Sequence, residues 1–165
     1  MTKEPLSQSP NIYRKGYNLD MFHYYKFIEV RFSDLDSFGH VNNARYLTYM
    51  EQARIGYFHH LGLWWPRHQP AIGLILADAQ VTFQHPILLE HKVKIGVRIS
   101  RLGNKSFPMH YRLEDAETGD VFATGTTIQV CYDYQNQRTI PIPEAWRQTI
   151  TAFEKLVEEV QTPRL

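Results

Sequence analysis

The sequence is poor in cysteine and has no long apolar run. Its one cysteine, Cys131, cannot form a disulfide within the chain, and its place in an apolar strand pattern predicts a buried structural thiol. No stretch of about 18 apolar residues predicts a transmembrane helix, and the first residues lack the apolar core of a signal peptide. We therefore expect a cytoplasmic protein that does not bind membranes.

The chain also has no large excess of positive or negative charge. The chain of 165 residues has 18 Lys and Arg against 17 Asp and Glu, which gives a formal net charge of +1. This balance gives no electrostatic reason to expect nucleic acid as a partner. The length and a hydrophobic content of 43% suit a globular protein with a single core.

Several catalytic motifs are absent as well. The chain has no G-x-S-x-G nucleophile elbow, no phosphate-binding Walker motif and no glycine pattern for dinucleotides. Its eight histidines are not spaced as metal ligands, since the neighbours His59 and His60 would point about 100° apart on a helix. We therefore expect neither a metal site nor a separate cofactor.

The most informative stretch is VRFSDLDSFGHVNNARYLTYMEQAR, residues 30–54. It reads as the end of a strand, an acidic turn and a long helix capped at Asn42 or Asn43. The expected apolar side of this helix is formed by Tyr46, Met50, Ala53 and Tyr57, with Leu47, Phe58 and Leu61 beside them. Asp34 and Asp36 then precede a helix N-terminus, whose unpaired N–H groups can stabilise an oxyanion. Spacing alone favours a capping or turn role for both aspartates.

A resemblance adds a catalytic role. The residues DLDSFGHVNNARY at 34–46, followed by YMEQAR at 49–54, resemble the D-x-D-x-x-G-H-V-N-N-A motif of bacterial acyl-CoA thioesterases. These proteins belong to the 4-hydroxybenzoyl-CoA thioesterase-like branch of the hot-dog superfamily, and a weaker likeness covers residues 24–140. The resemblance implies an acyl-CoA thioesterase in which Asp36 is catalytic and the backbone N–H of Asn43 polarises the thioester carbonyl. Coenzyme A is then part of the substrate.

The resemblance leaves the detailed roles open. Asp36 is expected to act either as the nucleophile or as a base for water. His40 either shapes the turn or takes part in acid–base chemistry, and Asp34 is expected to be structural. Substrate contacts are expected at Gly39, Val41, Tyr46 and Phe83, and for the coenzyme A phosphates at Arg101, Asn104, Lys105 and Ser106. Trp64 and Trp65 either cover the helix end or line an acyl pocket.

The rest of the chain predicts an α+β fold. A first strand is expected over 23–32, with Tyr25, Phe27 and Val30 as its apolar members. After a helix end near Gly62 come alternating strands over 74–84, which His85-Pro86 ends, and over 93–99, 107–114 and 122–134. On the strand over 74–84 we expect Ala77, Ala79, Val81 and Phe83 to share a face, and on the last strand Phe122, Ile128, Val130 and Tyr132. Pro108 predicts an edge strand or a bulge. A last helix opens at Pro143, with an apolar stripe of Trp146, Ile150, Phe153, Val157 and Val160.

These elements give an expected domain plan. Residues 1–20 are a flexible leader or a strap, 21–140 form the hot-dog domain, and 141–165 form a helix packed on it. The hot-dog fold implies a long central helix wrapped by a five- to six-stranded antiparallel sheet. One helix cannot cover both faces and both edges of such a sheet, so we expect self-association. The resemblance implies an edge-to-edge homodimer with active sites at its interface, or a homotetramer.

Two other functions fit the same sequence. One is a hot-dog hydratase or dehydratase acting on an acyl thioester, and the other is an acyl-CoA-binding protein without catalysis. The sequence leaves the acyl group open, and it does not separate coenzyme A from an acyl carrier protein.

Overall fold

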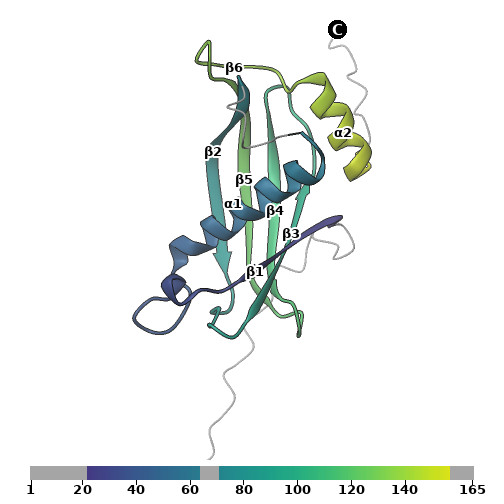
Figure 1. Ribbon diagram of the computed structural model, residues 1–165. Coiled ribbons are helices and arrows are strands. Elements are labelled where there is room, and N and C mark those ends of the chain that lie inside the picture. Colours follow the sequence, from purple (N-terminus) through teal and green to yellow (C-terminus); the bar gives the residue numbers. More distant parts are fainter. Residues whose placement is uncertain (1–21, 64–70, 157–165) are drawn as a thin grey trace, which may run out of the picture.

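The computed structural model describes residues 22–63 and 71–156. A long helix lies across one face of an antiparallel sheet, and a second helix packs at one end of that sheet (Figure 1). The elements are β1 (Tyr24–Glu29), the short 3₁₀ helix η2 (Phe32–Asp34), α1 (Asn43–His60), β2 (Ile72–Phe83), β3 (Lys92–Ile99), β4 (Ser106–Asp115), β5 (Val121–Asp133), β6 (Arg138–Thr139) and α2 (Glu144–Glu154). The strand order is β1-β3-β4-β5-β2, with β6 on β5. The predicted α+β architecture is confirmed.

Helix α1 begins and ends where the sequence predicts. The side chain of Asn42 caps it by accepting a hydrogen bond from the N–H of Ala44 at 3.0 Å. Its last carbonyls are satisfied because Gly62, with φ of +67°, lets the N–H groups of residues 62 and 63 turn back onto the helix. One detail of the apolar face is wrong. Leu47 is 42% exposed, whereas Tyr49 is buried in its place.

The central strands follow the predicted alternation. On β3 and β4 the predicted apolar residues are all buried, namely Val93, Ile95, Val97, Ile99, Phe107, Met109, Tyr111 and Leu113. On β1 the prediction is wrong. The strand ends at Glu29, and Tyr24 pairs with buried Val97 so that the alternate residues from Tyr24 face the core. Tyr25 and Phe27 therefore lie on the opposite face, where Phe27 is 63% exposed.

On strand β5, Ile128, Val130 and Tyr132 share a face as predicted, but the opposite face is the one turned to α1. The buried side carries Ala123, Gly125, Thr127, Gln129 and Cys131, whereas Ile128, Val130 and Tyr132 lie on the other face and are half-buried. The helix passes so close that a β-carbon on Gly125 would lie 2.6 Å from Met50 Cε. A small residue is therefore needed at position 125. The thiol of Cys131 is fully buried, as predicted, and burial raises its pKa to about 11.

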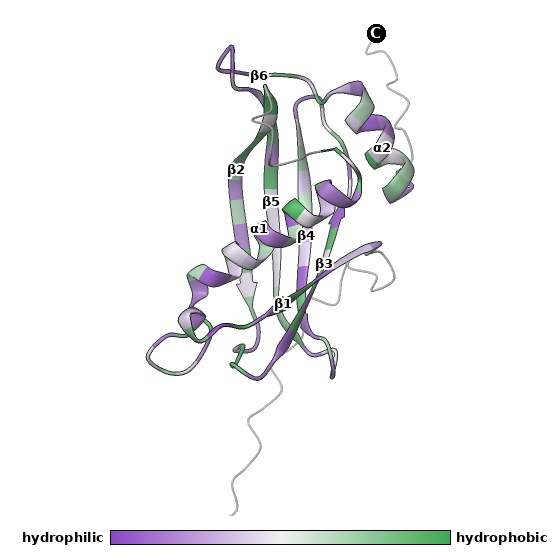
Figure 2. Ribbon diagram, in the orientation of Figure 1, coloured by the Kyte–Doolittle hydropathy of each residue, from purple (hydrophilic) through white to green (hydrophobic). Residues whose placement is uncertain are grey.

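Strand β2 is an edge strand with a bulge. The pairing with β5 shifts register between Leu76 and Asp78, which leaves Ala77 as the extra residue. The predicted common face therefore holds for Ala79, Val81 and Phe83 but not for Ala77. Figure 2 shows the apolar start of β2, residues 72–76, as a green stretch at the upper end of the strand.

The prediction that Pro108 marks an edge strand or a bulge is wrong, because β4 lies between β3 and β5 and its pairing with β5 is regular at Pro108. The β3 ladder begins only at Met109, opposite Ile99, so Pro108 pairs with β5 alone. Its missing N–H therefore interrupts no bond to β3.

Helix α2 packs on the same core. Ile150 is fully buried, the Trp146 and Phe58 rings are 6.1 Å apart, and Phe153 meets Tyr57 edge-on at 5.7 Å. Several predictions lie outside the described residues, namely the leader over 1–20, the roles of Trp64 and Trp65, and the stripe positions Val157 and Val160. No helix within 22–63 or 71–156 is both long and apolar enough to cross a bilayer.

Candidate active site

A tight loop between η2 and α1 carries the aspartates of the motif. The N–H of Asp36 donates to the carbonyl of His40 at 2.7 Å, and the N–H of Gly39 donates to the carbonyl of Asp36 at 3.1 Å. Gly39 has φ of +78°, a conformation that glycine adopts without a steric penalty. The N–H of Val41 donates to the carbonyl of Ile87 at 2.8 Å, which attaches the loop to the body of the domain.

The side chain of Asp36 is oriented by its own loop. Its Oδ1 accepts hydrogen bonds from the N–H groups of Phe38 at 2.8 Å and His40 at 3.2 Å. The residue is half-buried, and no described residue donates to Oδ2. The carboxylate is therefore held in one orientation while one oxygen stays available for chemistry.

Asp34 has a different environment. It is buried, its Oδ2 accepts hydrogen bonds from Tyr49 Oη at 2.8 Å and from the N–H of Arg31 at 3.1 Å, and Arg45 Nε lies 3.6 Å from Oδ1. Its carbonyl accepts from the N–H of Asn42 at 2.9 Å. These contacts join the loop to the start of α1, which agrees with the expected structural role of Asp34.

A cleft of about 270 Å³ lies beside this loop. It is lined by Asp36, His40, Val41, Asn43, Tyr46, Phe83, Gln84, His85 and Pro86. The cleft thus brings together six of the residues expected from the sequence. Asn43 is the first residue of α1, so its N–H lacks an acceptor within the helix. Gly39 does not line the cleft but sets the shape of the loop.

Two aromatic rings form one wall of the cleft. Tyr46 is buried and meets Phe83 edge-on, with ring centroids 4.9 Å apart, and burial raises the pKa of its hydroxyl. Residues 84–86 also line the cleft, and sequence reasoning did not predict this. The N–H groups of Gln84 and His85 both donate to the carbonyl of Phe122, and only the His85-Pro86 pair marked this segment, as the end of a strand.

The residues expected to hold the coenzyme A phosphates lie elsewhere. Arg101, Asn104 and Lys105 lie in the turn between β3 and β4, and Ser106 is the first residue of β4. Lys105 Nζ donates to Thr139 Oγ1 at 3.2 Å. In the sheet, Ser106 pairs with Val130, and Val130 pairs with Ile75 near the start of β2. The cleft instead lies beside Phe83, at the end of β2. Eight residues of strand separate Ile75 from Phe83, about 26 Å at roughly 3.3 Å per residue. Within one chain, the turn is therefore remote from Asp36.

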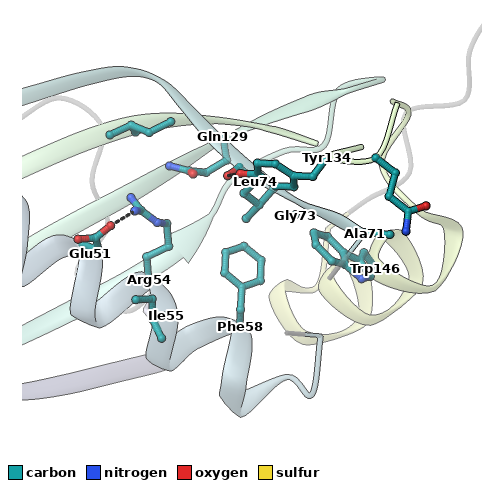
Figure 3. A pocket seen from close by; sticks show the side chains of 12 residues that line it. Glu51, Arg54, Ile55, Phe58, Ala71, Gly73, Leu74, Gln129, Tyr134 and Trp146 are labelled. Carbon is teal, nitrogen blue, oxygen red and sulfur yellow. Dashed lines mark hydrogen bonds and ion pairs between the residues drawn. The ribbon is translucent and has the colours of Figure 1, made fainter. Parts of the chain in front are cut away.

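A larger cavity, of about 630 Å³, opens at this same end; we call it the far cavity (Figure 3). It is lined by Glu51, Arg54, Ile55, Phe58, Ala71, Gly73, Leu74, Leu76, Gln129, Tyr134, Gln135 and Trp146. Its volume falls within the roughly 300–1,000 Å³ typical of small-molecule sites. Its walls are mainly apolar, and polar side chains come from α1 and β5. In the parts of the chain that the structure describes, no group of three or more His, Cys, Asp or Glu could hold a metal ion.

Comparisons with known proteins identify the family and the fold. The model of a family described as the thioesterase-like superfamily matches residues 30–150. A thioesterase from Thermus thermophilus, solved with coenzyme A and Zn, is 36% identical, with a TM-score of 0.73 over 84% of this chain and 98% of that chain. Long-chain acyl-CoA thioesterase FadM from Escherichia coli K12 is 26% identical over 78% of this chain and 97% of its own. The gentisyl-coenzyme A thioesterase BH1999 is 27% identical, with a TM-score of 0.67 over 75% of this chain and 99% of its own. These similarities confirm the hot-dog fold.

Proposed function

The chain belongs to the thioesterase-like superfamily and is a thioester hydrolase, and we propose that it hydrolyses an acyl-coenzyme A in the cleft beside Asp36. The observation that carries this proposal is the shared lining of that cleft, to which the Asp36 side chain and the start of α1 at Asn43 both contribute. A carboxylate can act as the base or nucleophile in attack on a thioester carbonyl, and a helix N-terminus can stabilise the oxyanion that forms.

The start of α1 stabilises negative charge on the carbonyl oxygen of the thioester. The N–H of Asn43 and the positive end of the helix dipole favour negative charge at this position. As the tetrahedral intermediate forms, charge develops on this oxygen. Fixed donors therefore stabilise the transition state more than the bound thioester.

Asp36 promotes attack on the carbonyl carbon by one of two routes. As a base it takes a proton from water, whose oxygen bonds to the carbon, and the C–S bond then breaks to release the coenzyme A thiolate, which takes up a proton. As a nucleophile its Oδ2 bonds to the carbon, the thiolate leaves, and water hydrolyses the resulting anhydride. The hydrogen bonds to Oδ1 from Phe38 and His40 orient the carboxylate for either route.

The complete site needs a second copy of the chain. β2 is an edge strand of 12 residues that exposes Ile72, Ile75 and Leu76, whereas the other edge, β1, has six residues and includes the charged Lys26 and Glu29. A long apolar edge favours pairing with another strand, and a short charged edge opposes it. We therefore propose an antiparallel homodimer through β2.

Such pairing would bring the turn at Arg101 of one copy closer to Asp36 of the other than the two lie within one chain. With a two-fold axis through the middle of β2, beside the bulge at Ala77, the strand end at Ile72 in one chain lies opposite Phe83 in the other. The far cavity and the turn at Arg101 of one copy then adjoin the Asp36 cleft of the other copy. The dimer supplies, at one place, an acyl chamber, a catalytic carboxylate and cationic groups for phosphates.

Replacement of Asp36 by Asn tests the proposal. The variant keeps acceptors for the loop N–H groups but loses the base or nucleophile, so kcat should fall about 10²–10⁴-fold. Release of free thiol from a panel of acyl- and aryl-CoAs measures this, with Asp120→Asn on the β4–β5 turn as the matched control. Near-normal turnover by Asp36→Asn would exclude Asp36 from the chemistry. Consumption of an enoyl or hydroxyacyl thioester without release of thiol would favour the hydratase alternative.

A further inference from the structure

The turn between β3 and β4 is held in shape through its carbonyl groups. Three successive carbonyls, those of residues 103–105, each accept a hydrogen bond from a different part of the chain. Arg147 Nη2 on α2 donates to the carbonyl of Gly103 at 2.7 Å. The N–H groups of Ile142, just before α2, and of Cys131, in β5, donate to the next two carbonyls, each at 2.9 Å. The conformation of this turn therefore depends on α2 and β5 as well as on its own sequence.

Arg147 is the one side chain among these three donors. It lies in the first turn of α2, where its own N–H donates to the carbonyl of Pro143 at 3.0 Å. The residue is half-buried, and its charge lies close enough to Cys131 to oppose the rise that burial causes in the pKa of the thiol. The guanidinium is thus fixed between α2, β5 and the turn. A bond from a charged donor is also stronger than one between neutral groups.

The turn combines this fixed backbone with exposed polar side chains. The N–H of Gly103 donates to the carbonyl of Ser106 at 2.9 Å, whereas Arg101, Asn104 and Lys105 are exposed. A segment that is already ordered loses little conformational freedom when it binds a ligand. Cations on such a turn therefore bind an anion more tightly than the same cations on a loose loop.

Helix α2 connects this turn to the far cavity. Trp146, the neighbour of Arg147, contributes its ring to the wall of the cavity (Figure 3). In the proposed dimer, the turn and the cavity of one copy adjoin the Asp36 cleft of the other. We propose that Arg147 is a positioning residue for coenzyme A, because its bond to the Gly103 carbonyl keeps the turn in the shape that presents Arg101 to the phosphates. The proposal rests on the proposed hydrolase function and on the dimer.

Arg147→Met tests the proposal in the full-length enzyme. The methionine keeps an apolar stem but removes the donors, so the turn loses one of its three anchors. KM for an acyl-coenzyme A should rise about three- to tenfold, the size of one ordinary hydrogen bond, with kcat nearly unchanged. KM for the same acyl group on N-acetylcysteamine, which lacks the phosphates, should stay as in the wild type. Titration calorimetry with adenosine 3′,5′-bisphosphate, which has phosphates but no thioester, should show Kd raised by the same factor.

A double variant separates positioning from direct contact. If Arg147 acts through the turn, Arg147→Met should raise KM little further once Arg101→Glu has removed the phosphate contact, because the two effects share one route. Gln148→Met, at an exposed position on the same helix, is the matched control and should leave KM and Kd unchanged. Arg147→Gln replaces Arg147→Met if the latter unfolds at a temperature well below that of the wild type.

Each outcome bears on one proposal. Wild-type KM and Kd in a folded Arg147→Met would overturn the positioning role. An equal rise in KM for both kinds of thioester would also overturn it, because it would show a general loosening of α2, and additive effects in the double variant would show that Arg147 acts independently of the turn. These results leave hydrolysis untouched. Full activity of Asp36→Asn would instead refute the catalytic proposal, and the calorimetry would still decide the role of Arg147.

Discussion

The hydroxyl of Tyr49 donates to Oδ2 of Asp34 at 2.8 Å and thereby ties the second turn of α1 to the loop before the helix. Asp36, only two residues along, bonds to its own loop and faces a cleft. Two aspartates of one motif are thus given separate tasks by their surroundings. Asp34 fixes the position of the loop, and Asp36 is left to face the cleft.

Tyr49→Phe tests this division. Loss of a buried hydrogen bond to a charged group should lower the free energy of unfolding by about 1.5–3 kcal/mol, or Tm by roughly 3–12 °C. It should also lower kcat, because the loop that orients Asp36 loses its anchor. Thermal unfolding and thiol release measure both, with Tyr25→Phe on the exposed face of β1 as the control. A variant with wild-type Tm and wild-type kcat would show that the contact does not position the loop.

Sequence reasoning succeeded where local chemistry decides the structure. The Asn42 cap, the glycine at the end of α1 and the alternation on β3 and β4 depend on neighbouring residues. It failed where pairing between distant strands decides. Which face of β1 is buried depends on register, and a shift of one residue reverses every side chain. The bulge at Ala77 arises in the same way.

In the candidate site, too, sequence reasoning found the residues set by local sequence and missed those placed by distant strands. The motif contained Asp36, His40 and Asn43, so their proximity followed from a short loop. Gln84 and its neighbours reach the cleft only because β2 ends beside Phe122, which no local pattern reveals. The far cavity, formed from both helices, β2 and β5, has no local signal at all.

Ile75→Lys tests the proposed dimer. A lysine on the exposed β2 edge should oppose strand pairing, so the chain should become monomeric and thioesterase activity should fall although Asp36 is intact. Light scattering coupled to gel filtration measures the mass. Phe27→Lys on the opposite edge, at β1, is the matched control and should remain dimeric and active. Dissociation by Phe27→Lys alone would place the interface at β1 instead.

Arg101→Glu tests the phosphate contact. If the turn of one copy adjoins the cleft of the other, a charge reversal should raise KM for coenzyme A esters by about tenfold, as expected for loss of a charge-assisted hydrogen bond. Thioesters truncated to N-acetylcysteamine lack the phosphates and should be hydrolysed as before. An equal rise in KM for both kinds of ester would count against a phosphate contact at Arg101.

Glu154 predicts an unusual pH dependence of stability. Its Oε1 accepts hydrogen bonds from Tyr57 Oη at 2.7 Å and from the N–H of Ile99 at 2.9 Å, whereas Oε2 is buried without a partner among the described residues. Burial raises the pKa of Glu154 above its usual value of 4.5, against the opposing effects of the two hydrogen bonds, Arg98 and His23. Folding therefore makes protonation of this carboxyl easier than it is in the unfolded chain.

The consequence is a loss of stability with rising pH, which Glu154→Gln should remove. A group whose pKa is raised on folding contributes its full stabilisation below the unfolded pKa and loses it as pH rises through the folded pKa. Above about pH 4.5, the wild type should therefore lose stability relative to Glu154→Gln. The loss should be about 1.4 kcal/mol per unit of pH between the pKa of Glu154 in the unfolded chain and its pKa in the folded protein. Urea unfolding at a series of pH values measures this, and Glu90→Gln, at an exposed position, should show no such slope. A difference that stays constant or moves the other way would mean that the buried carboxyl is charged in the folded protein.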